Sequence, residues 1–158
     1  MKKYIAASIL LVAIVSIAFV FTNKKEDEMT ICHSEIVWIK ENGTPDGIIL
    51  KSKMSLQIAD NHSGRMNFYG YIKEQDTVYR LDRAVYFEYN PVDNKGHFAI
   101  RFKSSSIMTS DNTPNNIFST FFNVDREKIN YYIQVKKMED NIYILKDEAY
   151  TSFTCFIE

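Results

Sequence analysis

Cys32 and Cys155 are the residues of this 158-residue chain whose type and spacing most clearly predict covalent chemistry. They are the only cysteines, and they bracket almost everything that follows an apolar N-terminal run. A disulfide between them would tie the first predicted strand to the last, and would remove roughly 4 to 5 kcal/mol of unfolded-chain entropy in the loop model. Disulfides persist in oxidising compartments, so we expect the domain to lie outside the cytoplasm.

Two other interpretations of the cysteines stay open at this point. They could be unrelated buried thiols, or Cys32 could be a nucleophile assisted by the neighbouring His33. Adjacent side chains on a strand point to opposite faces, so Cys32 and His33 could not interact directly. The disulfide is the interpretation we prefer.

The remaining residues that could do chemistry are dispersed. The sequence contains no glycine-rich phosphate loop, nucleophile elbow, paired-cysteine motif or zinc-protease motif. Its histidines, His33, His62 and His97, lie in separate segments without metal-ligand spacing. Asp82 and Glu88 can be drawn as a hydrolytic pair, but solvated strand faces often produce such pairs. We therefore expect no catalytic residue, metal site or cofactor, and interpret the protein as not an enzyme.

Charge and composition narrow the class of protein further. The chain has 19 basic and 20 acidic side chains. The first 22 residues hold two of the basic ones, Lys2 and Lys3, and no acid, so the rest of the chain has 17 basic residues and a formal charge of −3. A weakly acidic domain is a poor ligand for nucleic acid, because phosphate neutralisation supplies most of that affinity. Aromatic residues reach 14%, with five glycines and three prolines, so a disordered or collagen-like chain is excluded. The aromatic surplus suits either an ordinary core, or a pocket or protein-covered face.

The N-terminus predicts a membrane anchor. Residues Ile5 to Phe21 carry no charge, and 17 residues of helix just span a bilayer core of roughly 30 Å. A cleaved signal peptide is the alternative, but the run ends in the bulky residues 19–21 where a peptidase needs small ones. We expect an anchor over 1–22, a juxtamembrane linker over 23–29 and a β domain over 30–158. Lysines flank the run on both sides, so charge alone does not set the orientation.

Alternation of apolar and polar residues dominates the predicted domain. It predicts eight short antiparallel strands closed into a small barrel or strongly rolled sheet. Gly70 falls on an apolar face and suggests a bend or bulge. The expected strands are 31–40, 48–58, 66–72, 77–89, 98–102, 129–137, 142–146 and 149–157.

One stretch follows helical spacing instead. Thr113 and Pro114 are typical of a helix cap and first helical position. The apolar stripe that follows recurs at helical spacing and predicts a helix of about two turns. Its members are Ile117, Phe118, Phe121 and Phe122.

The layout of anchor, early cysteine, central aromatic strands and late cysteine resembles a known family. The segments that carry the resemblance are 68–71 (Phe-Tyr-Gly-Tyr), 79–87, 111–114 and 152–156. They resemble the FidL-like and ToxS-like inner-membrane accessory proteins, encoded beside membrane-bound winged-helix activators. Within that group the chain is most similar to MyfF/PsaF-type accessory regulators of fimbrial expression.

The resemblance implies a partner and a place in the cell. It implies a single-pass protein of the bacterial inner membrane with its C-terminal domain in the periplasm. There it would pair with the periplasmic domain of a one-pass winged-helix activator, stabilise or tune it, and be required for expression of a fimbrial adhesin. Such pairs resemble a lipocalin-like barrel shared by two chains, some of which take up bile salts, so an amphipathic small molecule is a second expected partner. The rival interpretation is a stand-alone anchored carrier or sensor of an apolar ligand.

Overall fold

The computed structural model describes residues 30–43, 47–122, 124, 130–147 and 152–157. The expected anchor over 1–22, with its span from Ile5 to Phe21, and the expected linker over 23–29 lie outside these residues. Within the described part, no helix has the length and apolar character needed to cross a membrane.

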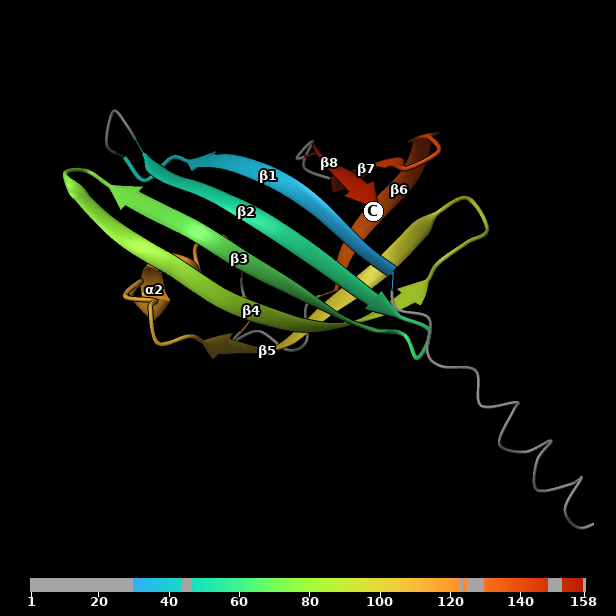
Figure 1. The fold of residues 1–158 in the computed structure, drawn as a ribbon, viewed down its shortest axis with the longest axis horizontal. Helices are drawn as coiled ribbons and strands as arrows, with labels where there is room; N and C mark the ends of the chain where they lie inside the picture. The colour runs from blue at the N-terminus through green and yellow to red at the C-terminus, as the bar shows by residue number, and fades with distance from the viewer. Residues whose placement is uncertain (1–29, 44–46, 123, 125–129, 148–151, 158) are drawn as a thin grey trace, which may run out of the picture.

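Eight antiparallel strands, joined in chain order, form a closed barrel (Figure 1). This confirms the predicted fold class: mainly β, with one short helix in the described residues. The strands are β1 (Thr30–Lys40), β2 (Ile48–Ala59), β3 (Ser63–Glu74), β4 (Thr77–Pro91), β5 (His97–Ile107), β6 (Tyr131–Glu139), β7 (Ile142–Asp147) and β8 (Ser152–Ile157).

Period-two alternation builds the wall of the barrel. In β2, Leu50 and Met54 are buried, whereas Lys51 and Lys53 between and beside them are exposed. Met54 lies opposite the buried Phe68 of β3, so apolar positions meet on the inner face. A shift of one residue would turn each set of side chains to the other face, which is why the pattern fixes the register.

Gly70 is not a bulge. Register continues through it on both sides, from Ser52 of β2 to Leu81 of β4. A Cβ at Gly70 would collide with the backbone of β2 at Lys51 and Ser52. The glycine therefore marks a close approach of two strands, and the register shifts among the described strands fall between Tyr86 and Phe87 and between Lys137 and Glu139 instead.

The helix is shorter than predicted and is capped differently. Helix α2 covers Asn115–Phe118, a single turn, with Pro114 at its N-cap position and no side-chain cap. Thr113 does not cap it, because its hydroxyl donates to the carbonyl oxygen of Arg80, 2.8 Å away on β4. The predicted apolar stripe is nevertheless buried at all four positions, Ile117, Phe118, Phe121 and Phe122.

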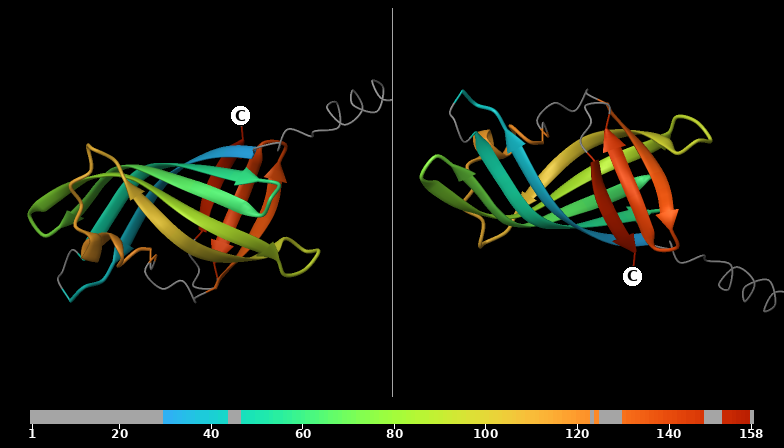
Figure 2. Two further views of the ribbon diagram at one scale, coloured as in Figure 1. Left: turned by 90° about the horizontal axis from the view of Figure 1, so that it is seen from below. Right: turned by 90° about the horizontal axis from the view of Figure 1, so that it is seen from above.

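Strand lengths divide the barrel into two unlike halves. Strands β1 to β5 are long, whereas β8 pairs with β1 only at Cys32 and His33, and β6 pairs with β5 only over 97–100. Beyond these positions β1 and β5 each pair with one strand only among the described residues, so the described wall of the barrel is split between them. The α2 segment lies at the end of the barrel where β1 to β5 extend beyond β6 to β8, as the two further views show (Figure 2).

Candidate functional site: an apolar cavity inside the barrel

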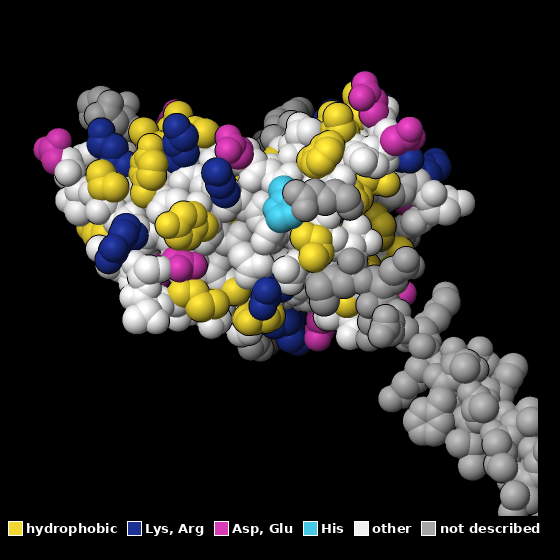
Figure 3. All heavy atoms as spheres, in the orientation of Figure 1, with side chains coloured by type: hydrophobic (Ala, Val, Ile, Leu, Met, Phe, Trp, Pro, Cys, Tyr) yellow, Lys and Arg dark blue, Asp and Glu magenta, His cyan; other side chains and the backbone are white. Residues whose placement is uncertain are grey.

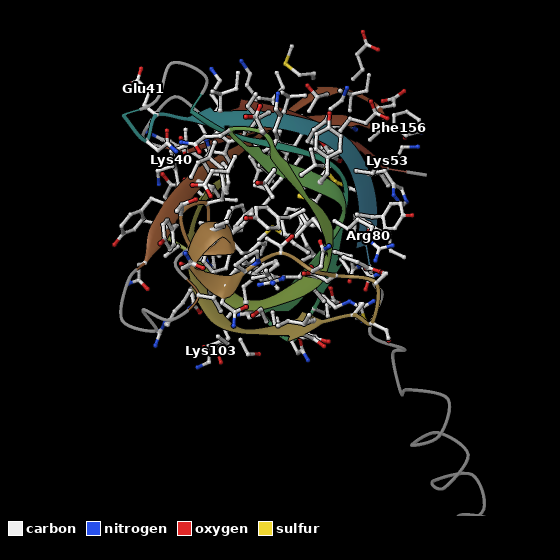
Figure 4. All side chains as sticks on the ribbon, turned by 90° about the vertical axis from the view of Figure 1, so that its left-hand side faces the viewer. Lys40, Glu41, Lys53, Arg80, Lys103 and Phe156 are labelled. Carbon is white, nitrogen blue, oxygen red and sulfur yellow. A yellow bond between two sulfur atoms is a disulfide. The ribbon has the colours of Figure 1, made fainter. Side chains whose placement is uncertain are left out.

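A cavity of about 610 Å³ runs inside the barrel. All eight strands contribute side chains to it, and Phe121 and Phe122 enter it from the chain just after α2. Its volume lies within the range of small-molecule sites, roughly 300 to 1,000 Å³. Viewed into the split end, α2 stands in the mouth of the barrel, and Lys40 lies on the rim (Figure 4).

Aromatic rings form much of the cavity wall. Trp38 of β1 meets Phe121 and Phe122 edge-on, with ring centroids 5.7 and 5.9 Å apart. Phe122 also packs against Phe68 of β3 at 4.6 Å. The surplus of aromatic residues in the sequence therefore serves as core and as cavity lining together. Eleven of the lining residues are aromatic: Trp38, Phe68, Phe87, Tyr89, Phe98, Phe102, Phe121, Phe122, Tyr131, Tyr143 and Phe153.

Few polar groups reach this apolar space. The hydroxyl of Tyr131 is buried and finds no hydrogen-bond partner among the described residues, and its ring lies 5.0 Å from that of Phe102. The hydroxyl of Tyr89 instead donates to the carbonyl oxygen of Ala59 at 2.9 Å. Burial, helped by the charge of Asp60, raises the pKa of Tyr89 and keeps this hydroxyl protonated. Unpartnered buried hydroxyls are rare, so Tyr131 offers a ligand one polar contact.

Cationic side chains add to the polar edge of the cavity. Lys40 and Lys146 both line it, together with Thr30 and Asp147. Lys40 extends from the end of β1 and its Nζ donates to the carbonyl oxygen of Thr120, just after α2. An apolar interior bordered by two lysines and one aspartate suits an amphipathic molecule, with an apolar body and a charged group.

A buried ion pair holds the α2 segment in the mouth. Arg83 points inward from β4, and its Nε donates to Asp111 Oδ2 at 2.9 Å. The same guanidinium donates to Asn115 Oδ1 at 2.8 Å and to the carbonyl oxygen of Thr113, and lies 4.8 Å from the ring centre of Phe118. Arg83 thus contacts both the loop residues that precede α2 and the helix itself.

Side chains also replace a missing strand beside β4. After β5 ends at Ile107, Asp111 Oδ2 accepts the backbone N–H of Asp82 at 2.9 Å, and Asn112 Oδ1 accepts that of Arg80 at 2.6 Å. Backbone groups complete the pairing, since the N–H of Asn112 donates to the Arg80 carbonyl at 3.1 Å. The loop therefore supplies hydrogen-bond partners for the backbone groups of β4 beyond the end of β5. These hydrogen bonds fix the position of the loop beside the split in the wall.

The disulfide lies at the seam that closes the barrel. Cys32 of β1 and Cys155 of β8 are bonded, with their Cα atoms 5.6 Å apart and a sequence separation of 123 residues. Both are buried and both line the cavity. Because β1 and β8 share only two paired positions, the covalent link carries much of the closure.

The other residues considered for chemistry remain apart. His33 lies on the outer face of β1, His62 in a turn beside Tyr89, and His97 against Asp93 at 2.8 Å. Asp82 accepts a hydrogen bond from Ser110, whereas Glu88 lies 3.3 Å from Lys103. In the described residues no group of three or more His, Cys, Asp or Glu side chains is placed to hold a metal ion.

Three residues of this site escaped the sequence analysis. Arg83 and Asp111 lie in the segments 79–87 and 111–114 that carry the family resemblance, but no role was predicted for either. Arg83 occupies an inward position in the alternation of β4, where a charge needs a partner. Tyr131 carried no signal of its own, because a tyrosine in a strand is ordinary core.

The comparisons with known proteins are consistent with this architecture. No curated protein matches the chain. A family model described as FidL-like putative membrane protein matches residues 70–155, which run from the middle of β3 to Cys155 of β8. This range includes the α2 segment, the Arg83–Asp111 pair and most of the cavity wall, and it covers more than half of the chain. The chain therefore belongs to the FidL-like family of membrane proteins.

Proposed function

We propose that this protein is an inner-membrane-anchored co-regulator, with the barrel in the periplasm. It pairs there with the periplasmic domain of a one-pass winged-helix transcriptional activator, which it stabilises or tunes. Expression of a fimbrial adhesin requires the pair. Family membership supports the membrane association, and the resemblance of the sequence to accessory regulators of fimbrial expression supports the choice of partner.

The split wall of the barrel is the observation that carries the pairing. Strand β5 from Arg101 to Ile107 pairs with β4 alone among the described strands. Ile107 lies opposite the buried Arg83, yet is itself 52% exposed, because no strand of the described chain covers it. Exposed edges of this kind accept an added strand, in which backbone hydrogen bonds supply affinity and side-chain pockets supply specificity.

The edge of β1 on the other side of the split makes this region suitable for binding a whole partner domain. Beyond His33, β1 pairs with β2 alone in the described part of the chain, up to Lys40. Strands from a partner placed between β1 and β5 would cover the α2 segment and close the cavity. Whatever favours the closed pair then raises the amount of competent activator, by ordinary binding linkage.

Deletion of the gene tests the proposal. We expect the transcript of the fimbrial operon and the amount of activator protein to fall, and both to recover with the wild-type gene in trans. Complementation with the chain carrying Cys32→Ser and Cys155→Ser tests whether the closed barrel is needed. An unchanged fimbrial transcript in the deletion strain would contradict the proposal.

A carrier or sensor of an amphipathic small molecule is a second candidate, favoured by the unpartnered Tyr131 hydroxyl in an apolar cavity. Trp38 is the only tryptophan of the chain and lines the cavity, so its fluorescence reports occupancy. We expect an anionic aromatic probe such as anilinonaphthalene sulfonate, or a bile salt, to change this fluorescence in a saturable way. If the isolated chain binds such molecules tightly and ignores the activator, the carrier is the better description.

A further inference from the structure

The outer face of the β1–β4 sheet has an unusual composition where the strands are longest. Register sets three neighbouring rows across the four strands. These twelve positions hold four cations, two acids and six aromatic or aliphatic residues. The rows are Glu35–Lys53–Tyr69–Asp82, Val37–Lys51–Tyr71–Arg80 and Ile39–Ile49–Lys73–Val78, and together they define the lysine–tyrosine face.

Large apolar side chains on this face are open to solvent. Tyr69 is 69% exposed, Val37 and Ile39 are each 62% exposed, and Val78 is 57% exposed. Single exposed apolar residues are common on any protein, but a contiguous group marks a binding surface. The space-filling view shows apolar and basic side chains interleaved over these strands (Figure 3).

The net charge of the face is opposite in sign to that of the domain. Its four cations outnumber its two acids, whereas residues 23–158 carry a formal charge of −3. Asp82 is further engaged by the hydroxyl of Ser110. Among the described residues, Lys51, Lys53 and Arg80 form no ion pair within 4.0 Å, and Lys53 and Arg80 lie on the outside of the barrel in Figure 4. The face is therefore complementary to an anionic surface.

We propose that the lysine–tyrosine face docks on the anionic phospholipid surface of the membrane that anchors the chain. Tyrosine is enriched at the membrane–water interface, and lysine and arginine are attracted to anionic headgroups. The seven residues of the expected linker, 23–29, reach roughly 25 Å at most, so the barrel stays near the bilayer and can lie on its side. The proposal rests on the proposed anchor and adds an orientation, which leaves the split edges free for a partner.

The test uses the full-length chain in lipid nanodiscs, with an environment-sensitive fluorophore on a single introduced cysteine. Because Cys32 and Cys155 are bonded to each other, the described chain offers no other free thiol. Val37→Cys places the label on the face, and Tyr132→Cys, on exposed Tyr132 of β6, is the control. Discs rich in phosphatidylglycerol are compared with phosphatidylcholine discs, with a headgroup-attached quencher in both.

We expect quenching at position 37 to be at least about twofold stronger in the anionic discs, and equal in both lipids at position 132. Reversing Lys51, Lys53 and Arg80 to glutamate should remove the difference. Reversing Lys95, Lys136 and Lys137 makes the same change in net charge elsewhere and should preserve it.

Four results would overturn the proposal. Equal quenching at position 37 in both lipids excludes docking on an anionic surface. If the fluorescence of the label at position 37 changes only after the activator is added, the face binds a protein and not the lipid. A chain that fails to enter the discs overturns the anchor as well, whereas an inserted chain with an unquenched position 37 overturns only the docking.

Discussion

Arg83 Nε lies 2.9 Å from Asp111 Oδ2, and both side chains are almost completely inaccessible, at 2% and 0% exposure. The pair joins the centre of β4 to the loop that precedes α2. Asp111 also accepts the backbone N–H groups of Asp82 and Thr113, so that its charge is fully surrounded by donors. A short, one-turn helix stays in the mouth of the barrel because this carboxylate fixes the chain before it.

Replacing Asp111 with asparagine should destabilise the protein strongly. Asparagine keeps the shape but leaves the guanidinium of Arg83 buried without a counter-charge, which costs about 3 to 5 kcal/mol. Thermal unfolding of the full chain in detergent measures the loss. Asp140→Asn removes the same group from the exposed pair with Lys137 and should leave stability unchanged. Equal effects of the two substitutions would show that the Arg83 pair does not hold the α2 segment.

Loss of the disulfide should open the barrel seam. The Cys32→Ser, Cys155→Ser double variant should lose about 4 to 5 kcal/mol of stability in the loop model, because the bond closes a long loop. Reduction of the wild-type chain should lower its unfolding temperature to that of the variant. A variant as stable as the wild type would mean that the pairing of β1 with β8 suffices for closure.

The Tyr131→Phe substitution distinguishes a role of the hydroxyl in ligand binding from a role in the stability of the core. Because the Tyr131 hydroxyl has no hydrogen-bond partner in the described part of the chain, its removal should leave stability unchanged or slightly raised. It should also weaken binding of an anionic aromatic probe measured by Trp38 fluorescence. Phe102→Ala, at the neighbouring ring, should instead cost about 3 to 5 kcal/mol. A large loss of stability in Tyr131→Phe would assign the hydroxyl a structural role.

Asp93 should make the β4–β5 turn sensitive to acid. Although its partial burial acts in the opposite direction, hydrogen bonds from the N–H groups of Lys95 and His97 and from the His97 ring lower the pKa of Asp93. The unfolded chain then takes up this proton at a higher pH than the folded chain, so the contribution to stability is present above about pH 4 and is lost as the pH falls below it. Asp93→Asn should lessen the fall in unfolding temperature over this acid range, and an unaltered profile would contradict the assignment.

Alternation alone was enough to predict most of the barrel. The apolar positions of β2 and β4 point inward as expected because a half-buried strand requires period two, and the helical stripe from Ile117 to Phe122 is buried. The cap was wrong for a physical reason: the Thr113 hydroxyl finds the carbonyl of Arg80, a partner distant in sequence. Local sequence propensity cannot predict a hydrogen-bond partner that lies close only in the folded chain.

The split of the barrel was beyond sequence reasoning for a similar reason. It depends on β8 meeting β1 at only two positions and β6 meeting β5 at four. The first pairing joins the first strand to the last, and the second depends on how the chain folds between β5 and β6. The side chains of Asp111 and Asn112 that substitute for a strand beside β4 look like ordinary turn residues in the sequence. The cysteines were more informative, because only two exist and each falls in a terminal strand.

The most direct test of the account is a site-specific cross-link at the open edge of β5. A photoreactive amino acid at Ile107 is compared with one at Met138 of β6, which has a similar exposure of 55%, in the full chain co-expressed with the neighbouring activator. We predict a cross-linked species containing the periplasmic domain of the activator at position 107 and none at position 138. A chain that cross-links to the activator at neither position, or equally at both, would contradict pairing at the split wall.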